Sequence, residues 1–230
     1  MSTHFSAIRA CVFDAYGTVF DFNSAVARHR ARVGPMADQL SELWRSKQIQ
    51  YSWLRSLMGA YAPFWTVTTE ALQHSMAALG LSDPQIEKLL MQAYLELEAF
   101  AEVPAMLDEL RAMNLRTAIL SNGNPEMLEA AARNAGLADR FEALLSIDEA
   151  RIYKTSPRTY QIVLDRLGLR REEVCFLSSN CWDAHGAAYF GFDVAWVNRS
   201  GAPDDHLPGH IAAELRSLAG LPELLRAARS

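Results

Sequence analysis

The stretch Ala10-Cys11-Val12-Phe13-Asp14-Ala15-Tyr16-Gly17 contains a short apolar run, residues 10–13. An acid follows the run directly, and a glycine stands three residues after the acid. A short continuous apolar run is typical of a buried strand, and a glycine close behind it indicates a turn. We therefore predict a strand over 10–13 that ends at Asp14, so that a carboxylate stands at the carboxyl end of the strand.

Downstream of Pro104 the sequence alternates between patterns typical of helices and patterns typical of strands. Helices are expected at 104–113, 125–135, 156–167 and 182–189, strands at 116–120, 143–146, 174–177 and 194–197, and a closing helix at 217–230. Strands that alternate with helices of this length predict parallel βαβ units with helices on both faces of the sheet.

The segment between the first strand and this alternating region has a different character. From about residue 23 to residue 100 the pattern is helical, with a break at 59–63 and a new helix at Pro84, capped by Ser82 or Asp83. We predict an α/β fold, a doubly wound, Rossmann-like parallel sheet formed by residues 1–20 and 101–230, with residues 21–100 inserted as a helical cap.

Composition limits the function classes. The 230 residues are 50% hydrophobic and carry a net charge of -5. A basic surface supplies the affinity for nucleic acids and anionic membranes, so we expect neither as a partner. The three cysteines show no zinc-type spacing, the first nine residues lack a signal-peptide pattern, and no apolar run approaches the roughly 20 residues of a membrane span. We expect reduced thiols and a cytoplasmic protein.

Polar residues recur where the predicted strands end. Ligands of an open parallel sheet bind beyond the carboxyl ends of its strands, so these residues are expected to converge. Each alone has a structural explanation: Asp14 could cap a turn, Ser121 and Ser178 could be N-caps, and Lys154 could be a solvated charge. Their recurrence at successive strand ends favours a site. The residues are Asp14, the run Ser121-Asn122-Gly123, Lys154, and the run Ser178-Ser179-Asn180 with Asp183.

These residues form an ordered set of motifs that resembles the haloacid dehalogenase superfamily. The stretch Phe13 to Thr18 resembles its first motif, Ser121-Asn122-Gly123 its second and Lys154 its third. The fourth, Ser178-Ser179-Asn180-Cys181-Trp182-Asp183, is similar to the form found in L-2-haloacid dehalogenases. The similarity continues at 44–51 and 56–59 in the insertion and at 189–192 and 196–199.

Two departures separate the sequence from the superfamily's magnesium-dependent phosphatases. Those enzymes have a second aspartate two residues after the first, which protonates the leaving alkoxide; here that position is Tyr16. A halide needs no proton when it leaves. The fourth motif begins with Ser178 and Ser179 instead of acids, and magnesium prefers carboxylates. We therefore expect no metal and no cofactor.

The resemblance implies a hydrolase acting on carbon–halogen bonds. Asp14 would attack C2 of a small L-2-haloacid and form an ester, which water would hydrolyse to the D-2-hydroxy acid. Arg45, Asn122 and Trp182 would hold the halide, while Tyr16, Ile49 and Phe64 would form an apolar wall. Lys154 would orient Asp14, Ser121 would bind the substrate carboxylate, and Asp183 would position water. Thr18, Tyr160, Ser178 and Asn180 would support these groups.

Other interpretations stay open. Arg45 taken alone suits a surface arginine beside a core tryptophan, and Asp183 suits a first-turn acid that complements a helix dipole. We interpret Cys181 as structural and His185 as solvent-facing or supporting. Rival functions are a magnesium-dependent phosphatase and a non-catalytic carboxylate-binding protein. The family resemblance also implies a homodimer formed through the insertion, with a 2-halocarboxylate and a halide as small-molecule partners.

Overall fold

The computed structural model describes residues 4–229, and its centre is a six-stranded sheet in the spatial order β5-β4-β1-β6-β7-β8. Every neighbouring pair in this sheet is parallel, which confirms the predicted α/β class. The strands are β1 (Ala10–Phe13), β4 (Arg116–Ser121), β5 (Ala143–Ser146), β6 (Val174–Ser178), β7 (Asp193–Val197) and β8 (Ala213–Leu215).

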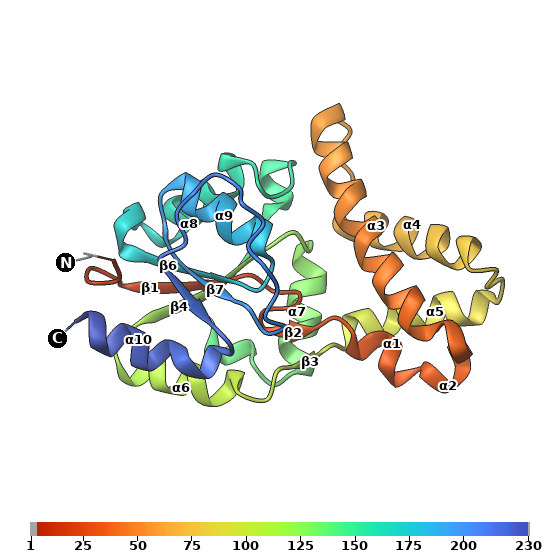
Figure 1. Ribbon diagram of the computed structural model, residues 1–230, viewed down its shortest axis with the longest axis horizontal. Coiled ribbons are helices and arrows are strands. Elements are labelled where there is room, and N and C mark those ends of the chain that lie inside the picture. The colour runs from red at the N-terminus through yellow and green to blue at the C-terminus, as the bar shows by residue number, and fades with distance from the viewer. Residues whose placement is uncertain (1–3, 230) are drawn as a thin grey trace.

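Helices cover both faces of the sheet, as Figure 1 shows, with α8 and α9 on one face and α6 and α10 on the other. Strand β1 is therefore buried along its whole length, which explains its unbroken apolar sequence. The helices of this region are α6 (Val103–Ala112), α7 (Pro125–Asn134), α8 (Pro157–Leu167), α9 (Cys181–Phe190) and α10 (Leu221–Ala228).

Residues 20–99 form a group of helices that stands to one side of the sheet (Figure 1). Two short antiparallel strands join its ends, with Phe20 paired to Ala99 and Asp21 to Glu98. The elements are β2 (Phe20–Asp21), α1 (Ser24–Arg28), α2 (Arg30–Val33), α3 (Ala37–Met58), α4 (Phe64–Ala78), α5 (Pro84–Leu95) and β3 (Glu98–Ala99).

Local sequence signals explain the limits of these helices. Helix α3 ends at Gly59, which adopts the left-handed conformation at φ 66°, and its N–H bonds to the Ser56 carbonyl. Asp83 caps α5 by accepting a hydrogen bond from the Gln85 backbone N–H at 2.8 Å. The turn after β1 needs Gly17, because its φ is 92° and a Cβ there would lie 3.0 Å from the Ser179 hydroxyl.

The predicted elements match the observed ones apart from their ends and the shortest strands. Strands at 10–13 and 143–146 have the predicted bounds. The break at 59–63 separates α3 from α4, which begins at Phe64, and the closing helix expected from 217 begins at Leu221 after a short 3₁₀ turn. Strands β2, β3 and β8 were not predicted, because two or three residues carry no detectable period. Within residues 4–229 no helix has the length and apolar character of a membrane span.

Candidate active site

Asp14 lies directly after β1, at the carboxyl edge of the sheet. Its backbone N–H continues the ladder by donating to the Leu177 carbonyl at 2.8 Å, and the residue is only 6% exposed. Four side chains donate to its carboxylate. Lys154 Nζ is 3.0 Å from Oδ1, while Oδ2 accepts from Asn180 Nδ2 at 2.8 Å, Thr18 Oγ1 at 3.2 Å and Ser178 Oγ at 3.5 Å. The carboxylate is thus fixed in one orientation.

Neighbouring backbone groups orient these donors in turn. The Ser179 N–H donates to Thr18 Oγ1 at 2.8 Å, and the Asn180 N–H donates to Ser178 Oγ at 3.2 Å. Each hydroxyl therefore accepts one backbone hydrogen bond, which orients it toward Asp14. The loop after β6 supplies both N–H groups, so this loop and the turn after β1 form one hydrogen-bonded unit.

Lys154 is a buried cation between two carboxylates. Its Nζ lies 3.0 Å from Asp14 Oδ1 and 2.9 Å from Asp183 Oδ2, and 5.1 Å from the centre of the Phe176 ring. Burial alone would lower the pKa of Lys154, but the charges of Asp14 and Asp183 outweigh it, so the pKa is raised above 10.5. The ammonium therefore stays charged across the physiological range.

Asp183 lies in the first turn of α9 and is fully buried. Its Oδ1 accepts a hydrogen bond from Tyr160 Oη at 2.8 Å, and its Oδ2 faces Lys154. Burial raises the pKa of Asp183, against the opposing charge of Lys154. The family resemblance implied that Tyr160 supports the reacting groups; in the structure its hydroxyl contacts Asp183, so its direct effect is to orient that carboxylate.

Arg45 reaches the site from α3 in the insertion. One guanidinium nitrogen lies 3.2 Å from Asn180 Oδ1 and 3.4 Å from the Tyr16 carbonyl, and the other donates to Gln48 Oε1 at 2.8 Å. The guanidinium carbon lies 4.8 Å from the centre of the Phe22 ring. Arg45 therefore meets the sheet edge through Asn180, which itself donates to Asp14.

Aromatic rings form one wall of this region. The Tyr16 ring lies 5.7 Å from Phe64 in a stacked arrangement and 5.3 Å from Tyr94. The buried Tyr16 hydroxyl has no hydrogen-bond partner among the described residues, and a Cβ at Gly123 would lie 2.7 Å from it. Tyr16 and Phe64, both predicted for the wall, are thus brought together. Ile49 is half-buried on α3, one turn beyond Arg45.

The three predicted halide-binding residues have separate partners. Asn122 Oδ1 accepts from the Lys154 backbone N–H at 3.1 Å. Trp182 is half-buried, packs edge-on against Trp53 at 5.3 Å and lines a groove of about 740 Å³. Arg45 instead bonds to Asn180. Ser121, predicted for the substrate carboxylate, is buried and its Oγ accepts from the Gly123 N–H at 3.0 Å.

Sequence reasoning missed two residues that hold Arg45 in place. Gln48 is buried and donates through Nε2 to Thr68 Oγ1 at 2.7 Å and to Tyr94 Oη at 3.0 Å, while its Oε1 accepts from Arg45. Gln48 follows Arg45 by three residues, a helical spacing that places both on one face. That spacing was the available signal for Gln48; nothing local in the sequence marks Tyr94.

The oxygen atoms of the Asp14 carboxylate and the nearby Tyr16 carbonyl face hydrogen-bond donors. Asp14 Oδ2 and the Tyr16 carbonyl both accept from Asn180 Nδ2, at 2.8 and 3.3 Å, and Asp14 Oδ1 accepts from Lys154. A divalent cation needs oxygen ligands with free lone pairs. Here the Lys154 ammonium, the Asn180 amide and the Arg45 guanidinium supply the positive potential that a metal ion supplies in metal-dependent sites.

A parallel sheet with a buried, donor-bound aspartate at the end of its first strand defines a class of hydrolases that use a carboxylate nucleophile. The chain belongs to the haloacid dehalogenase-like hydrolases, whose family model matches residues 8–191. Within that family the similarity is to (S)-2-haloacid dehalogenases, which confirms the resemblance drawn from the motifs. The chain is 47% identical over 219 residues to (S)-2-haloacid dehalogenase 1 of Pseudomonas sp. (strain CBS-3), covering 95% of this chain and 96% of that protein.

Solved structures agree with this assignment. A crystal structure of a dehalogenase matches with a TM-score of 0.93 and 45% identity, covering 95% of this chain and 97% of that one. The L-2-haloacid dehalogenase from Xanthobacter autotrophicus, solved with chloropropionic acid covalently bound, matches with a TM-score of 0.88 and 39% identity, covering 95% and 98%. The likeness therefore extends over the sheet and the inserted helices together.

Proposed function

We propose that the protein hydrolyses small L-2-haloacids to D-2-hydroxy acids, with Asp14 as the nucleophile and no metal ion. The observation that carries this proposal is the Asp14 carboxylate, nearly buried and held by Lys154, Asn180, Thr18 and Ser178. A solved relative at 39% identity holds chloropropionic acid covalently, as an ester-forming enzyme would.

In the first step a carboxylate oxygen of Asp14 attacks C2 of the substrate, in line with the carbon–halogen bond. The new C–O bond takes its electron pair from Asp14, and the C–halogen pair leaves with the halide, so no proton is transferred and C2 is inverted. Negative charge thus moves from Asp14 to the halide. We assign the stabilisation of that halide to Arg45, because a guanidinium is weakly hydrated and always charged.

In the second step water attacks the side-chain carbonyl carbon of the Asp14 ester. The C–O bond to the substrate carbon is kept, the acyl C–O bond breaks, and one proton of the water passes to the departing alkoxide oxygen to give the D-2-hydroxy acid. The other proton passes to solvent, and Asp14 returns as a carboxylate. Asp183 is assigned to position or activate this water together with Lys154, since its Oδ2 lies 2.9 Å from Lys154 Nζ. Ester formation frees Lys154 from the charge of Asp14, so Asp183 becomes its remaining carboxylate partner.

The buried rings of Tyr16 and Phe64 are assigned to exclude bulk water during the displacement, and Ile49 is assigned to the same wall. We further assign substrate binding to the unpartnered Tyr16 hydroxyl, because a buried hydroxyl without a partner costs about 1–3 kcal/mol that a bound carboxylate would recover. Ser121, Asn122 and Trp182 complete the proposed substrate contacts.

A phosphatase is disfavoured by the position that would hold its general acid. That position is Tyr16, whose pKa burial raises well above its usual value, which makes it a poor proton donor to an alkoxide. A non-catalytic carboxylate-binding protein is disfavoured by the Asp14–Lys154–Asp183 set, because binding an anion gains nothing from two buried carboxylates.

We propose a homodimer in the cytoplasm as the working form. The end of α3 exposes Trp53, Leu54, Leu57 and Met58, with Leu57 84% exposed, and such an apolar patch is typical of an interaction surface. The free, buried thiols of Cys11, Cys175 and Cys181 suit a reducing compartment.

Halide release from L- and D-2-chloropropionate in EDTA tests the proposal. We expect release from the L isomer only, unaffected by EDTA, and lost by a factor on the order of 10⁴ in Asp14→Asn. The matched control is Asp165→Asn, an exposed acid on α8, which should keep the wild-type rate. Release from the D isomer, dependence on a metal, or an unchanged rate in Asp14→Asn would overturn it.

A further inference from the structure

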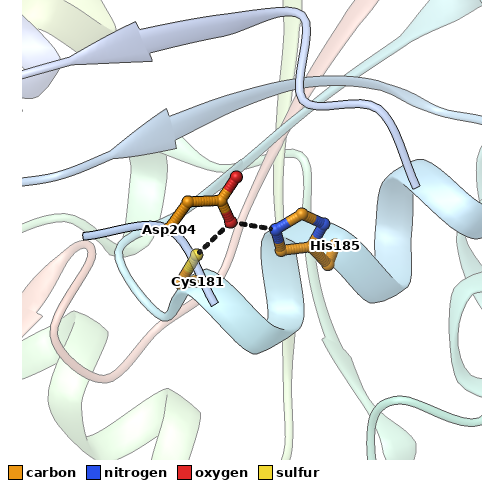
Figure 2. A group of neighbouring side chains, drawn as sticks. All are labelled: Cys181, His185 and Asp204. Atoms are coloured by element: carbon orange, nitrogen blue, oxygen red, sulfur yellow. Dashed lines mark hydrogen bonds and ion pairs between the residues drawn. The ribbon is translucent and has the colours of Figure 1, made fainter. Parts of the chain in front are cut away.

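A second cluster of reactive side chains lies outside the proposed mechanism. Cys181 and His185 are on α9, and Asp204 is on the connection between β7 and β8 (Figure 2). The one ligand atom that each residue offers lies within 4.8 Å of the other two. We expected Cys181 to be structural and His185 to face solvent or support the site. In the structure the His185 side chain is buried and directed at Asp204.

The three ligand atoms lie near enough to one another to converge on a single metal ion if Asp204 moves. Cys181 Sγ lies 3.7 Å from Asp204 Oδ1, and His185 Nε2 lies 2.6 Å from the same oxygen. Zinc bonds to sulfur, nitrogen and oxygen place neighbouring ligand atoms roughly 3.4–3.6 Å apart. The Cys–Asp separation already fits, and the His–Asp separation must open by about 1 Å. Asp204 can make that movement, because its side chain is 48% exposed.

Helix spacing and a backbone carbonyl pre-orient the two ligands on α9. Cys181 and His185 are four residues apart and therefore share one face of the helix. His185 Nδ1 lies 3.1 Å from the Gly209 carbonyl, which can only accept, so Nδ1 carries a proton. Nε2 faces the Asp204 carboxylate, another acceptor, so it must give up a proton before it can coordinate a metal. A backbone carbonyl bonded to the other ring nitrogen is the usual support of a metal-bound histidine.

We propose that Cys181, His185 and Asp204 form a binding site for Zn²⁺, with water as the fourth ligand. On binding, the proton of the Cys181 thiol and any proton on His185 Nε2 pass to solvent. The Cys181 thiolate and the Asp204 carboxylate then balance the charge of the ion. Thiolate, imidazole and carboxylate together favour Zn²⁺ over Mg²⁺ or Ca²⁺, which prefer oxygen. The bound ion would fasten the β7–β8 connection to α9.

The competing reading is a plain ion pair between His185 and Asp204, in which Cys181 takes no part. Titration of untagged protein, freed of metals by chelation and dialysed, with Co²⁺ separates the two. We expect one Co²⁺ per chain, with tetrahedral d–d bands and a thiolate-to-cobalt charge-transfer band, and displacement by Zn²⁺. Cys181→Ser should abolish the charge-transfer band and weaken Zn²⁺ binding at least about 10-fold in calorimetry.

His185→Gln and Asp204→Asn should weaken Zn²⁺ binding to a similar degree, whereas His74→Gln, an exposed histidine on α4, should not. Thermal unfolding in EDTA checks that each variant is folded. Absence of a charge-transfer band in the wild type, or equal Zn²⁺ affinity in Cys181→Ser, overturns the proposal. Asp14→Asn should bind Zn²⁺ normally, so this result is independent of the dehalogenase assay.

Discussion

The sheet edge and the inserted helices contribute to the same site in different ways. At the sheet edge Asp14, Lys154 and Asp183 form a continuous chain of charges with separations of 3.0 and 2.9 Å. From the insertion one cation, Arg45, reaches the residues around Asp14 with contacts of 3.2 and 3.4 Å, and Phe64 packs on Tyr16. Among the described residues, the other polar contacts of the insertion, such as Trp65 N–H to Asn124 Oδ1 at 3.0 Å and Tyr153 N–H to Ser56 Oγ at 3.1 Å, involve none of the three charged side chains.

This difference indicates a division of tasks. The reacting atoms are held by loops that follow parallel strands in fixed register, with Phe13 beside Leu177 and Ile119. Register cannot slip without exposing buried residues, so these groups are rigidly placed. We propose that the inserted helices surround the substrate and exclude water, and among the described residues of these helices only Arg45 brings a charge to the residues around Asp14. Substitutions at the sheet edge should therefore damage both stability and catalysis, and those in the insertion mainly catalysis.

The largest effect expected is from Lys154→Met. Two buried carboxylates would lose their shared cation, which should lower the free energy of unfolding by about 3–5 kcal/mol and kcat/KM by about 10²–10³-fold. Denaturant unfolding and halide release measure the two quantities. Lys88→Met, at an exposed site on α5, is the matched control. A stable variant with a wild-type rate would show that neither stability nor catalysis depends on the Asp14–Lys154–Asp183 charges.

An intermediate effect is expected from Arg45→Lys. The positive charge remains, but the planar guanidinium that contacts Asn180, Tyr16 and Gln48 is lost. The activation free energy should therefore rise by about 2 kcal/mol, which lowers kcat/KM about 30-fold. The free energy of unfolding should change by less than about 1 kcal/mol. Arg55→Lys, on the same helix, controls for the substitution itself. A loss of stability as large as that of Lys154→Met would remove the distinction between the two regions.

The smallest effect is expected from pH. The raised pKa of Lys154 means that its charge, and the stability it contributes, are fully present below 10.5 and are lost only as pH rises through the higher folded value. Between about pH 8 and about pH 10, kcat/KM should therefore change by less than about twofold. A tenfold fall centred within that range, in protein shown to be folded, would mean that Lys154 does not keep its proton.

Sequence predicted the sheet edge better than the insertion, for a physical reason. Strand ends of a parallel sheet meet at one edge, so finding the strands was enough to place Asp14, Lys154 and Asp183 together. A helix pattern shows which residues share a face but not what that face meets. Arg45 was therefore predicted through family resemblance alone, and Tyr94, which lies far along the chain from Gln48, was missed.

The connection between β7 and β8 is a second place where the sequence does not show which elements pack together. Residues 198–212 have no periodic pattern, so nothing in the sequence placed Asp204 and Gly209 against His185. Of the two expectations for His185, solvent-facing or supporting, the first is contradicted, because this connection packs against α9 and the ring is buried.

The small β2–β3 sheet has a consequence for how such a protein can change over evolutionary time. Phe20 and Asp21 pair with Ala99 and Glu98, so the chain leaves and rejoins the region near β1 at almost the same point. The entropy of closing a loop rises only with the logarithm of its length. Whatever stands between these two strands can therefore be lengthened, shortened or exchanged at little cost, and selection can vary what reaches Asp14 while the strands below it stay unchanged.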